Sequence, residues 1–126
     1  MRANEREILI KPSGSTPLLS FDPENTRILI SGTSFAENPF LLFSPVNELV
    51  EQYLIFGYDH LHLEVRLTYF NSSTSKALFF LLKRISRLVH KIEVKIDWYL
   101  VEQDDDLEEI VSDYSSELDL DINLIR

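Results

Sequence analysis

The chain of 126 residues contains no cysteine, which excludes disulfide bonds, thiolate zinc sites and cysteine nucleophiles. Its three glycines are scattered, so the glycine-rich phosphate-binding loops of nucleotide enzymes are missing. No apolar run reaches the ~18 residues of a membrane-spanning helix, and the first residues lack the apolar region of a signal peptide. The sequence therefore predicts a cytoplasmic protein without membrane insertion.

Acidic charge is abundant but confined to one part of the chain. The net charge is −9, yet residues 1–101 hold eleven Lys/Arg and eleven Asp/Glu, whereas residues 102–126 hold ten acids and one base. This distribution argues against a nucleic-acid partner. Apolar residues make up 44% of the sequence, enough for a packed core. We expect a single domain over residues 1–126, with residues 1–11 as a loose extension that includes a short strand candidate at 8–10.

The most informative stretch runs from Leu61 to His90. Residues 61–69 alternate between apolar and polar side chains, which predicts a half-buried strand with Tyr69 on its inner side. Five small polar residues follow at 71–75, and residues 76–90 then have the apolar spacing of a helix. The rest of the chain surrounds this strand–helix unit.

Other elements are predicted on both sides of that unit. Residues 16–21 and 27–31 form a hairpin that Gly32 ends, and a helix runs from Ser44-Pro45 to Gly57. A strand follows at 92–100, then a helix after three aspartates at 104–106 and a closing strand at 122–125. Strand–helix–strand units favour parallel pairing. The predicted fold is therefore α/β, a mixed sheet of about five strands with helices packed mainly on one face.

The polar cluster Asn71-Ser72-Ser73-Thr74-Ser75 lies where a strand passes into a helix. Such residues cap the free N–H groups of a helix start, and we predict that Ser72 or Ser73 is the cap, with the Ser72 hydroxyl reachable from solvent. Five in a row exceed what capping requires. The remaining hydroxyls lie at the positive end of the helix dipole, where a phosphate is favoured. A polar loop with a cap is the simpler interpretation.

Two aromatic residues of the helix at 76–90 fall outside its core stripe, which consists of Leu78, Leu81, Leu82, Ile85, Leu88 and Val89. They are Phe79 and Phe80. Four basic residues surround Phe80 on the same helix: Lys76, Lys83, Arg84 and Arg87. An exposed aromatic among cations is typical of a docking surface. The alternative is that Phe79 packs beneath a loop and Phe80 is a tolerated surface residue.

No enzymatic site is evident. His60 and His62 lie on one face of a strand, where two imidazoles can share a metal, but no third ligand is spaced to complete a site. His90 is best explained as a residue favoured by the helix C-terminus. Because no catalytic or calcium-binding motif occurs, the sequence predicts a protein without cofactors or enzymatic activity. A small metal enzyme that uses His60 and His62 is the rival.

Three separated motifs, over roughly residues 12–126, resemble the SiaC family of bacterial regulatory phosphoproteins. They are, in order, Gly32-x-Ser34-x-x-Glu37-Asn38, then Tyr69-x-Asn71-Ser72-Ser73-x-x-Lys76-Ala77, and Trp98-Tyr99 before Asp104–Asp106. This resemblance implies the STAS fold of anti-sigma-factor antagonists. It also implies a switch in which a histidine-kinase-like ATPase-type Ser/Thr kinase modifies one hydroxyl and a PP2C-type phosphatase reverses the modification.

In this family the unmodified form is expected to activate a diguanylate cyclase, which links the switch to cyclic-di-GMP and biofilm formation. The matching phosphoacceptor is Ser72, where threonine often stands, with Ser73 and Thr74 as alternatives. The motifs and the docking surface together predict a partner site at Glu37, Asn38, Tyr69, Asn71, Ser73, Lys76, Phe79, Phe80, Lys83, Arg84 and Arg87. A constitutive interaction or small-ligand-binding domain without phosphoregulation is the alternative.

Overall fold

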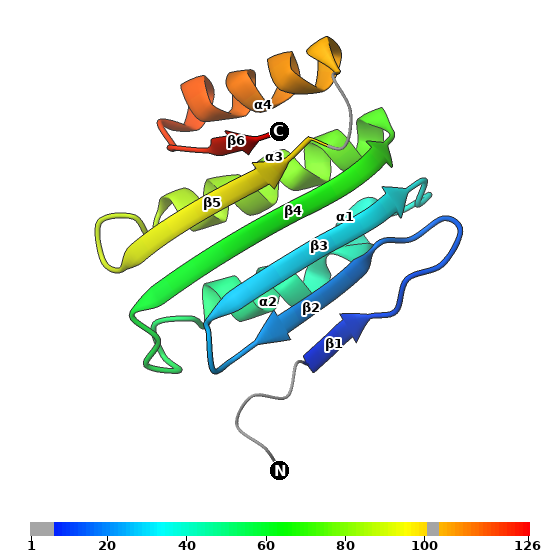
Figure 1. Ribbon diagram of the computed structural model, residues 1–126. Coiled ribbons are helices and arrows are strands. Elements are labelled where there is room, and N and C mark those ends of the chain that lie inside the picture. Colours follow the sequence, from blue (N-terminus) through cyan, green and yellow to red (C-terminus); the bar gives the residue numbers. More distant parts are fainter. Residues whose placement is uncertain (1–6, 101–103) are drawn as a thin grey trace.

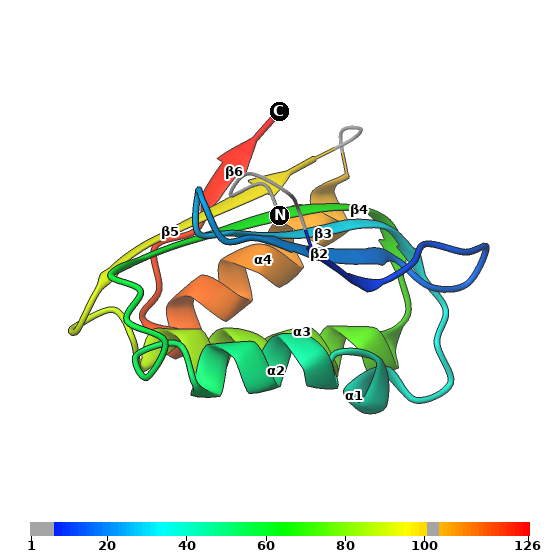
Figure 2. The ribbon, with the colours of Figure 1, turned by 90° about the horizontal axis from the view of Figure 1, so that it is seen from below.

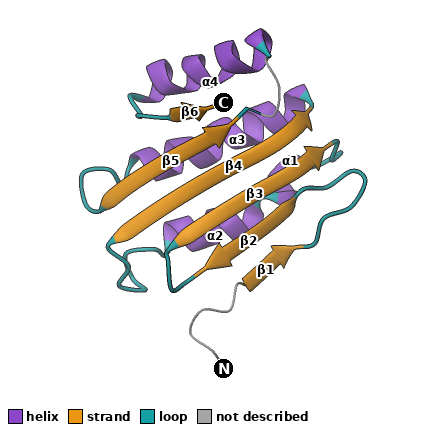
Figure 3. Cartoon of the chain, in the orientation of Figure 1, coloured by secondary structure: helices purple, strands orange, loops and turns teal. Residues whose placement is uncertain are grey.

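The described residues build one mixed sheet of six strands (Figure 1). The computed structural model describes residues 7–100 and 104–126. The strands are β1 (Glu7–Ile10), β2 (Leu18–Asp22), β3 (Arg27–Ser34), β4 (His60–Phe70), β5 (Glu93–Tyr99) and β6 (Asn123–Ile125). The helices are α1 (Pro39–Leu42), α2 (Ser44–Glu51), α3 (Ser72–Ser86) and α4 (Asp105–Leu118). Figure 3 separates the helices and strands by colour.

Strand order in the sheet follows chain order, β1-β2-β3-β4-β5-β6. The first three strands pair antiparallel, and β3 to β6 pair parallel. All four described helices lie on one face of the sheet (Figure 2). The predicted mixed sheet with helices on one face is confirmed, with six strands among the described residues instead of about five. The short apolar run at 8–10 forms edge strand β1, and residues 1–6 lie outside the described part.

The core lies between the three central strands and α3. Apolar residues alternate along β3, β4 and β5, and the parallel register brings them level, with Ile30 beside Val65 and Val65 beside Trp98. Five of the six residues in the core stripe predicted for residues 76–90 are buried, and the sixth, Val89, is partly buried against the same core. The helical spacing therefore identified the buried face of α3 correctly.

Two helix ends differ from the prediction. The helix expected to run to His90 ends at Ser86, because Arg87 and Leu88 donate to carbonyls three residues back, which tightens the chain into turns. His90 is thus an exposed turn residue. Similarly, α2 ends at Glu51 instead of near Gly57, and Leu54, which lies within the predicted helix, is an exposed turn residue. A separate short helix, α1, precedes α2.

A bulge between β3 and β4 changes which residues face the core. Gly32 does not end β3: the strand continues to Ser34, and the register shifts after Gly32, which has φ = 110°. The shift ends the alternation of β4, so Tyr69 is exposed and Phe70 packs toward Trp98, with ring centres 6.2 Å apart. The prediction that Tyr69 points inward was therefore wrong, because an alternating sequence pattern does not show where a strand contains an inserted residue.

We expect Gly32→Ala to lower the free energy of unfolding by ~1–2 kcal/mol, because an L-residue is strained at this positive φ. Space is not the reason, since an added Cβ would lie 3.7 Å from Pro17 Cα, an ordinary contact. Urea unfolding followed by circular dichroism measures the change. Gly14→Ala is the matched control and should show no loss, because nothing lies within 4 Å of its added Cβ. Equal midpoints for both variants would contradict strain at Gly32.

Candidate functional site

The candidate site lies where β3 and β4 end side by side and α3 begins. Asn71 connects the two strand ends, since its N–H donates to the Ser34 carbonyl at 3.2 Å. The carboxyl ends of parallel strands are where α/β proteins commonly bind their ligands. The polar cluster, the β3–α1 loop and the first turn of α3 therefore converge on the edge of the sheet that is best suited to recognition.

Asn71 caps α3. Its backbone is extended (φ −80°, ψ 173°), and its side-chain oxygen accepts the Thr74 N–H at 2.9 Å. The prediction that Ser72 or Ser73 is the cap was wrong, because the helix begins at Ser72 and the side chain one residue earlier already reaches the N3 amide. The capping role and the candidate acceptor are thus on different residues.

Two other hydroxyls of the cluster are engaged inside the protein. Thr74 is 0% exposed, and its hydroxyl is hydrogen-bonded to that of Ser34 at 2.8 Å. Ser75 is hydrogen-bonded through its hydroxyl to Tyr114 Oη at 2.5 Å, and Tyr114 Oη also donates to the Ser75 carbonyl at 2.9 Å. Burial raises the pKa of Tyr114, so the phenol stays a neutral donor that joins α4 to α3.

Ser72 and Ser73 are the two exposed hydroxyl residues of the cluster. None of the hydrogen bonds between described residues uses either hydroxyl. The prediction that the Ser72 hydroxyl is reachable from solvent is confirmed. Because Asn71, Thr74 and Ser75 hold the turn in place, these two side chains are presented on a fixed helix start.

Thr74→Val is expected to lower the free energy of unfolding by ~1–3 kcal/mol, because it leaves the buried Ser34 hydroxyl without its partner. The double variant with Ser34→Ala removes both polar groups and should recover part of that loss. Thermal and urea unfolding of the three variants closes a double-mutant cycle. Strictly additive effects would show that the two hydroxyls are not coupled.

An aromatic pair joins α1 to the middle of α3. Phe40 of α1 and Phe80 of α3 are each 48% exposed, with ring centres 5.6 Å apart. They border a shallow groove of about 440 Å³ between α2 and α3, which Glu51 and Arg84 also line. The predicted exposure of Phe80 is confirmed, whereas Phe79 is partly buried, with its ring centre 6.2 Å from that of Tyr114.

Charge on this surface is mixed. Arg84 forms an ion pair with Glu51, so this cation is engaged across the groove. Lys76, Lys83 and Arg87 are exposed, and no ion pair within residues 7–100 and 104–126 involves them. We define the docking surface as the aromatic pair together with these cations: Phe40, Phe80, Lys76, Lys83, Arg84 and Arg87.

The remaining predicted partner residues lie on the loops around this edge. Glu37 is exposed, and Asn38 caps α1 by accepting the Leu41 N–H at 3.2 Å. Tyr69 stacks on Phe35, with ring centres 4.8 Å apart. Sequence reasoning missed Phe35 and Phe40; the signals were aromatic residues directly after a strand and after the Asn38-Pro39 helix start.

His60 and His62 each contact acids at the start of β4. His60 Nδ1 lies 2.7 Å from the Asp59 carboxylate and its Nε2 lies 3.1 Å from Glu93, and the hydrogen bond with Asp59 raises the pKa of His60. His62 Nε2 lies 2.8 Å from Asp97. Within the described ranges, no three His, Asp or Glu residues come together as a metal site.

Asp97 is a buried carboxylate on the helix-free face. Burial alone would raise its pKa, but hydrogen bonds from Asn123 and His62 and the nearby charge of Lys95 outweigh burial and hold the pKa below its ordinary value. Its contribution to stability is therefore complete at neutral pH and is lost as the pH falls through this lowered pKa. The carboxylate joins β4, β5 and β6.

The described residues thus form an α/β domain with a mixed sheet, helices on one face and exposed hydroxyls at the first turn of α3. No helix in the described part of the chain is long and apolar enough to cross a membrane. The chain belongs to the SiaC family of regulatory phosphoproteins, whose family model matches residues 10–126.

Known proteins similar to this chain come from Pseudomonas aeruginosa. An uncharacterized protein of strain UCBPP-PA14 is 36% identical over 72 residues, which are 57% of this chain and 57% of that protein. The chain thus matches just over half the length of this curated relative. SiaC of Pseudomonas aeruginosa is 26% identical, with a TM-score of 0.79 over 97% of both chains.

Two further solved structures share the fold. Apo-SiaC has a TM-score of 0.83 at 24% identity, covering 97% of this chain and 99% of that chain. A chain in the crystal structure of the diguanylate cyclase SiaD in complex with its activator SiaC has a TM-score of 0.83 at 26% identity, covering 92% of this chain and 96% of that chain.

Proposed function

We propose that this chain is a non-enzymatic switch, a single STAS-like domain over residues 1–126 that binds an effector when Ser72 is unmodified and releases it when Ser72 is phosphorylated. The observation that carries this proposal is that the side chains of the polar cluster differ in their contacts. Asn71, Thr74 and Ser75 are engaged in the fold, whereas Ser72 is exposed at the first position of α3. Ser72 is therefore available to a modifying enzyme.

The position of Ser72 suits a phosphate. Backbone N–H groups at the start of a helix and the helix dipole both favour an anion there, and Lys76 lies one turn further along the same helix. Phe80 follows one turn after Lys76, about 12 Å from Ser72 at ~1.5 Å per residue. A phosphate at Ser72 would thus lie at one end of the docking surface.

The effector that we propose is a diguanylate cyclase, because SiaC, with which this chain shares its family and fold, is the activator in the SiaC–SiaD complex. A histidine-kinase-like ATPase-type kinase would add the phosphate, and a PP2C-type phosphatase would remove it. The kinase needs a serine hydroxyl, and the phosphatase a phosphoserine, that a protein active site can reach, and the exposure of Ser72 supports both. We place this switch in the cytoplasm.

Mass spectrometry of the protein isolated from its native cell tests the proposal. The expected result is a phosphopeptide modified at Ser72, which increases when the phosphatase is deleted. A phosphate on Ser73 instead would move the acceptor by one residue and contradict the assignment to Ser72. Absence of any phosphate in the phosphatase deletion would favour the constitutive interaction or ligand-binding domain.

A further inference from the structure

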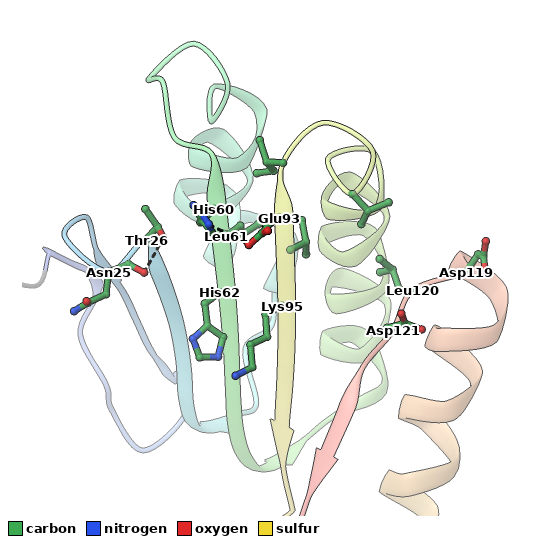
Figure 4. A pocket seen from close by; sticks show the side chains of 13 residues that line it. Asn25, Thr26, His60, Leu61, His62, Glu93, Lys95, Asp119, Leu120 and Asp121 are labelled. Carbon is green, nitrogen blue, oxygen red and sulfur yellow. Dashed lines mark hydrogen bonds and ion pairs between the residues drawn. The ribbon is translucent and has the colours of Figure 1, made fainter.

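Strand β5 is covered along only half of its outer edge. β6 pairs with Asp97, Trp98 and Tyr99, and no other described strand lies beyond β5. The first half of β5, from Glu93 to Ile96, therefore has β4 on one side and no strand on the other. In Figure 4 the chain leaves Asp121 at a distance from β5 and approaches β5 only as it enters β6, which leaves a wedge beside the first half of β5.

Two backbone hydrogen bonds at the ends of β5 show which of its residues direct their N–H and C=O groups toward this wedge. The Leu100 N–H donates to the Ile125 carbonyl at 2.8 Å, so Leu100 points its amide toward the β6 side, whereas the Glu93 N–H donates to Asp59 on the β4 side. Residues along a parallel strand alternate between the two sides. Val94 therefore directs its N–H and C=O toward the wedge, ahead of the first residue that β6 pairs.

The wedge opens into a cavity of about 700 Å³ with a mixed lining. Val89, Ile92, Val94 and Leu120 form its apolar part beside β5, and polar residues that include Asn25, Thr26 and His62 line the part beyond the start of β4. Leu120 is buried, and the other three apolar residues are partly buried at the margin of the core. This apolar part of the lining, next to unpaired strand groups, provides the two features that bind an extended peptide: a backbone ladder and a side-chain pocket.

The charges around the wedge favour a basic occupant. Asp119 and Asp121, from the α4–β6 connection, lie on the wall opposite β5 (Figure 4). Neither forms an ion pair within residues 7–100 and 104–126, whereas Lys95 is already paired with Asp97 at 3.6 Å and His60 with Asp59 and Glu93. Among the described residues, Asp119 and Asp121 are thus the lining carboxylates that form no ion pair, and a ligand would meet them.

We propose that this wedge is a second binding site, which takes an extended segment of a partner protein that adds to the outer edge of β5. The segment has aliphatic, β-branched residues directed into the cavity and Lys or Arg residues opposite Asp119 and Asp121. The site lies at the amino ends of β4 and β5, whereas Ser72 follows the carboxyl end of β4. It is therefore separate from the docking surface.

A titration of the full-length protein with a fluorescein-labelled hexapeptide of alternating valine and lysine tests this site. Fluorescence anisotropy should show saturable binding below about 1 mM. N-methylation of the valine amides removes ladder donors and should weaken binding at least ~10-fold, and replacing every lysine with glutamate should abolish it. Absence of binding by the parent peptide, or equal binding of the N-methylated peptide, overturns the proposal.

Variants of the protein locate the peptide. The pair Asp119→Asn and Asp121→Asn should weaken binding about 3–10-fold, whereas the matched control Asp113→Asn, an exposed acid of α4 outside the cavity, should bind as the wild type does. Equal binding by the paired variant overturns the proposed position. Ser72→Asp should bind the peptide unchanged, so failure of the phosphoswitch leaves this result unaffected, and a loss here would contradict a separate site.

Discussion

Phosphorylation of Ser72 is expected to weaken effector binding at least ~30-fold, about 2 kcal/mol, while the fold stays intact. Modification adds about −1.5 to −2 charge to a small exposed hydroxyl. A partner packed against neutral Ser72 would have to desolvate this charge without a matching cation. The helix itself tolerates the phosphate, because the dipole favours it by ~0.3–1 kcal/mol and Asn71 supplies the cap.

Isothermal titration of the proposed diguanylate cyclase partner with phosphorylated and unmodified protein measures this change. Ser72→Ala should bind as the unmodified protein does in the presence of the kinase, and Ser72→Asp should bind weakly. Ser73→Ala is the matched control and should still lose binding when the kinase is added, because Ser72 remains. Full affinity of the phosphoprotein, or unchanged phosphorylation of Ser72→Ala, would rule out the mechanism.

Phe80→Ala should weaken effector binding by ~1–2 kcal/mol or more, about 5–30-fold, because aromatic anchors in a surface groove contribute much of an interface's energy. Its ring is half exposed and contacts Phe40 across the groove. The free energy of unfolding should change little, since the core stripe of α3 lies on another face. Titration with the cyclase and urea unfolding measure the two effects separately.

Phe56→Ala is the matched control, because Phe56 is 53% exposed but lies beyond the end of α2, outside the docking surface. It should leave the affinity for the cyclase unchanged. If Phe80→Ala instead lowers the free energy of unfolding by ~3 kcal/mol, the residue belongs to the core and the docking surface is wrongly assigned. Equal losses of affinity in both variants would also argue against a localised surface.

Periodicity was sufficient for the fold wherever one face of an element is buried. The stripe of α3 and the alternation of β4 up to Leu67 identified core residues correctly, because side-chain direction is set by helix and strand geometry. Periodicity predicted the end of β3 at Gly32 and the direction of Tyr69 incorrectly. Both depend on a bulge, which arises from how β3 and β4 pair, and the residue pattern of one strand does not show how the other strand pairs with it. The predicted ends of α2 and α3 were also wrong, because turns replace the last expected helical hydrogen bonds while the apolar spacing continues.

The sequence predicted which residues lie at the start of α3 but not the structural role of each of them. The cluster at 71–75 was correctly placed at a helix start, yet which hydroxyl is free depends on Ser34 and Tyr114, each about 40 residues away in the chain. Phe40 was missed because its importance arises from contact with Phe80. The wedge beside β5 likewise depends on the length over which β6 pairs, which local sequence cannot specify.

The strands lie in the sheet in the same order as in the chain, and this order has a consequence for folding during synthesis on the ribosome. Each strand from β2 onward pairs with the strand made immediately before it, so a growing chain always finds its neighbour already translated. None of the six strands in the described residues has to insert between two that are already paired. The nascent sheet therefore extends from one edge, and the pairing of β3 with β4, beside which Ser72 lies, is available before α4 and β6 have been translated.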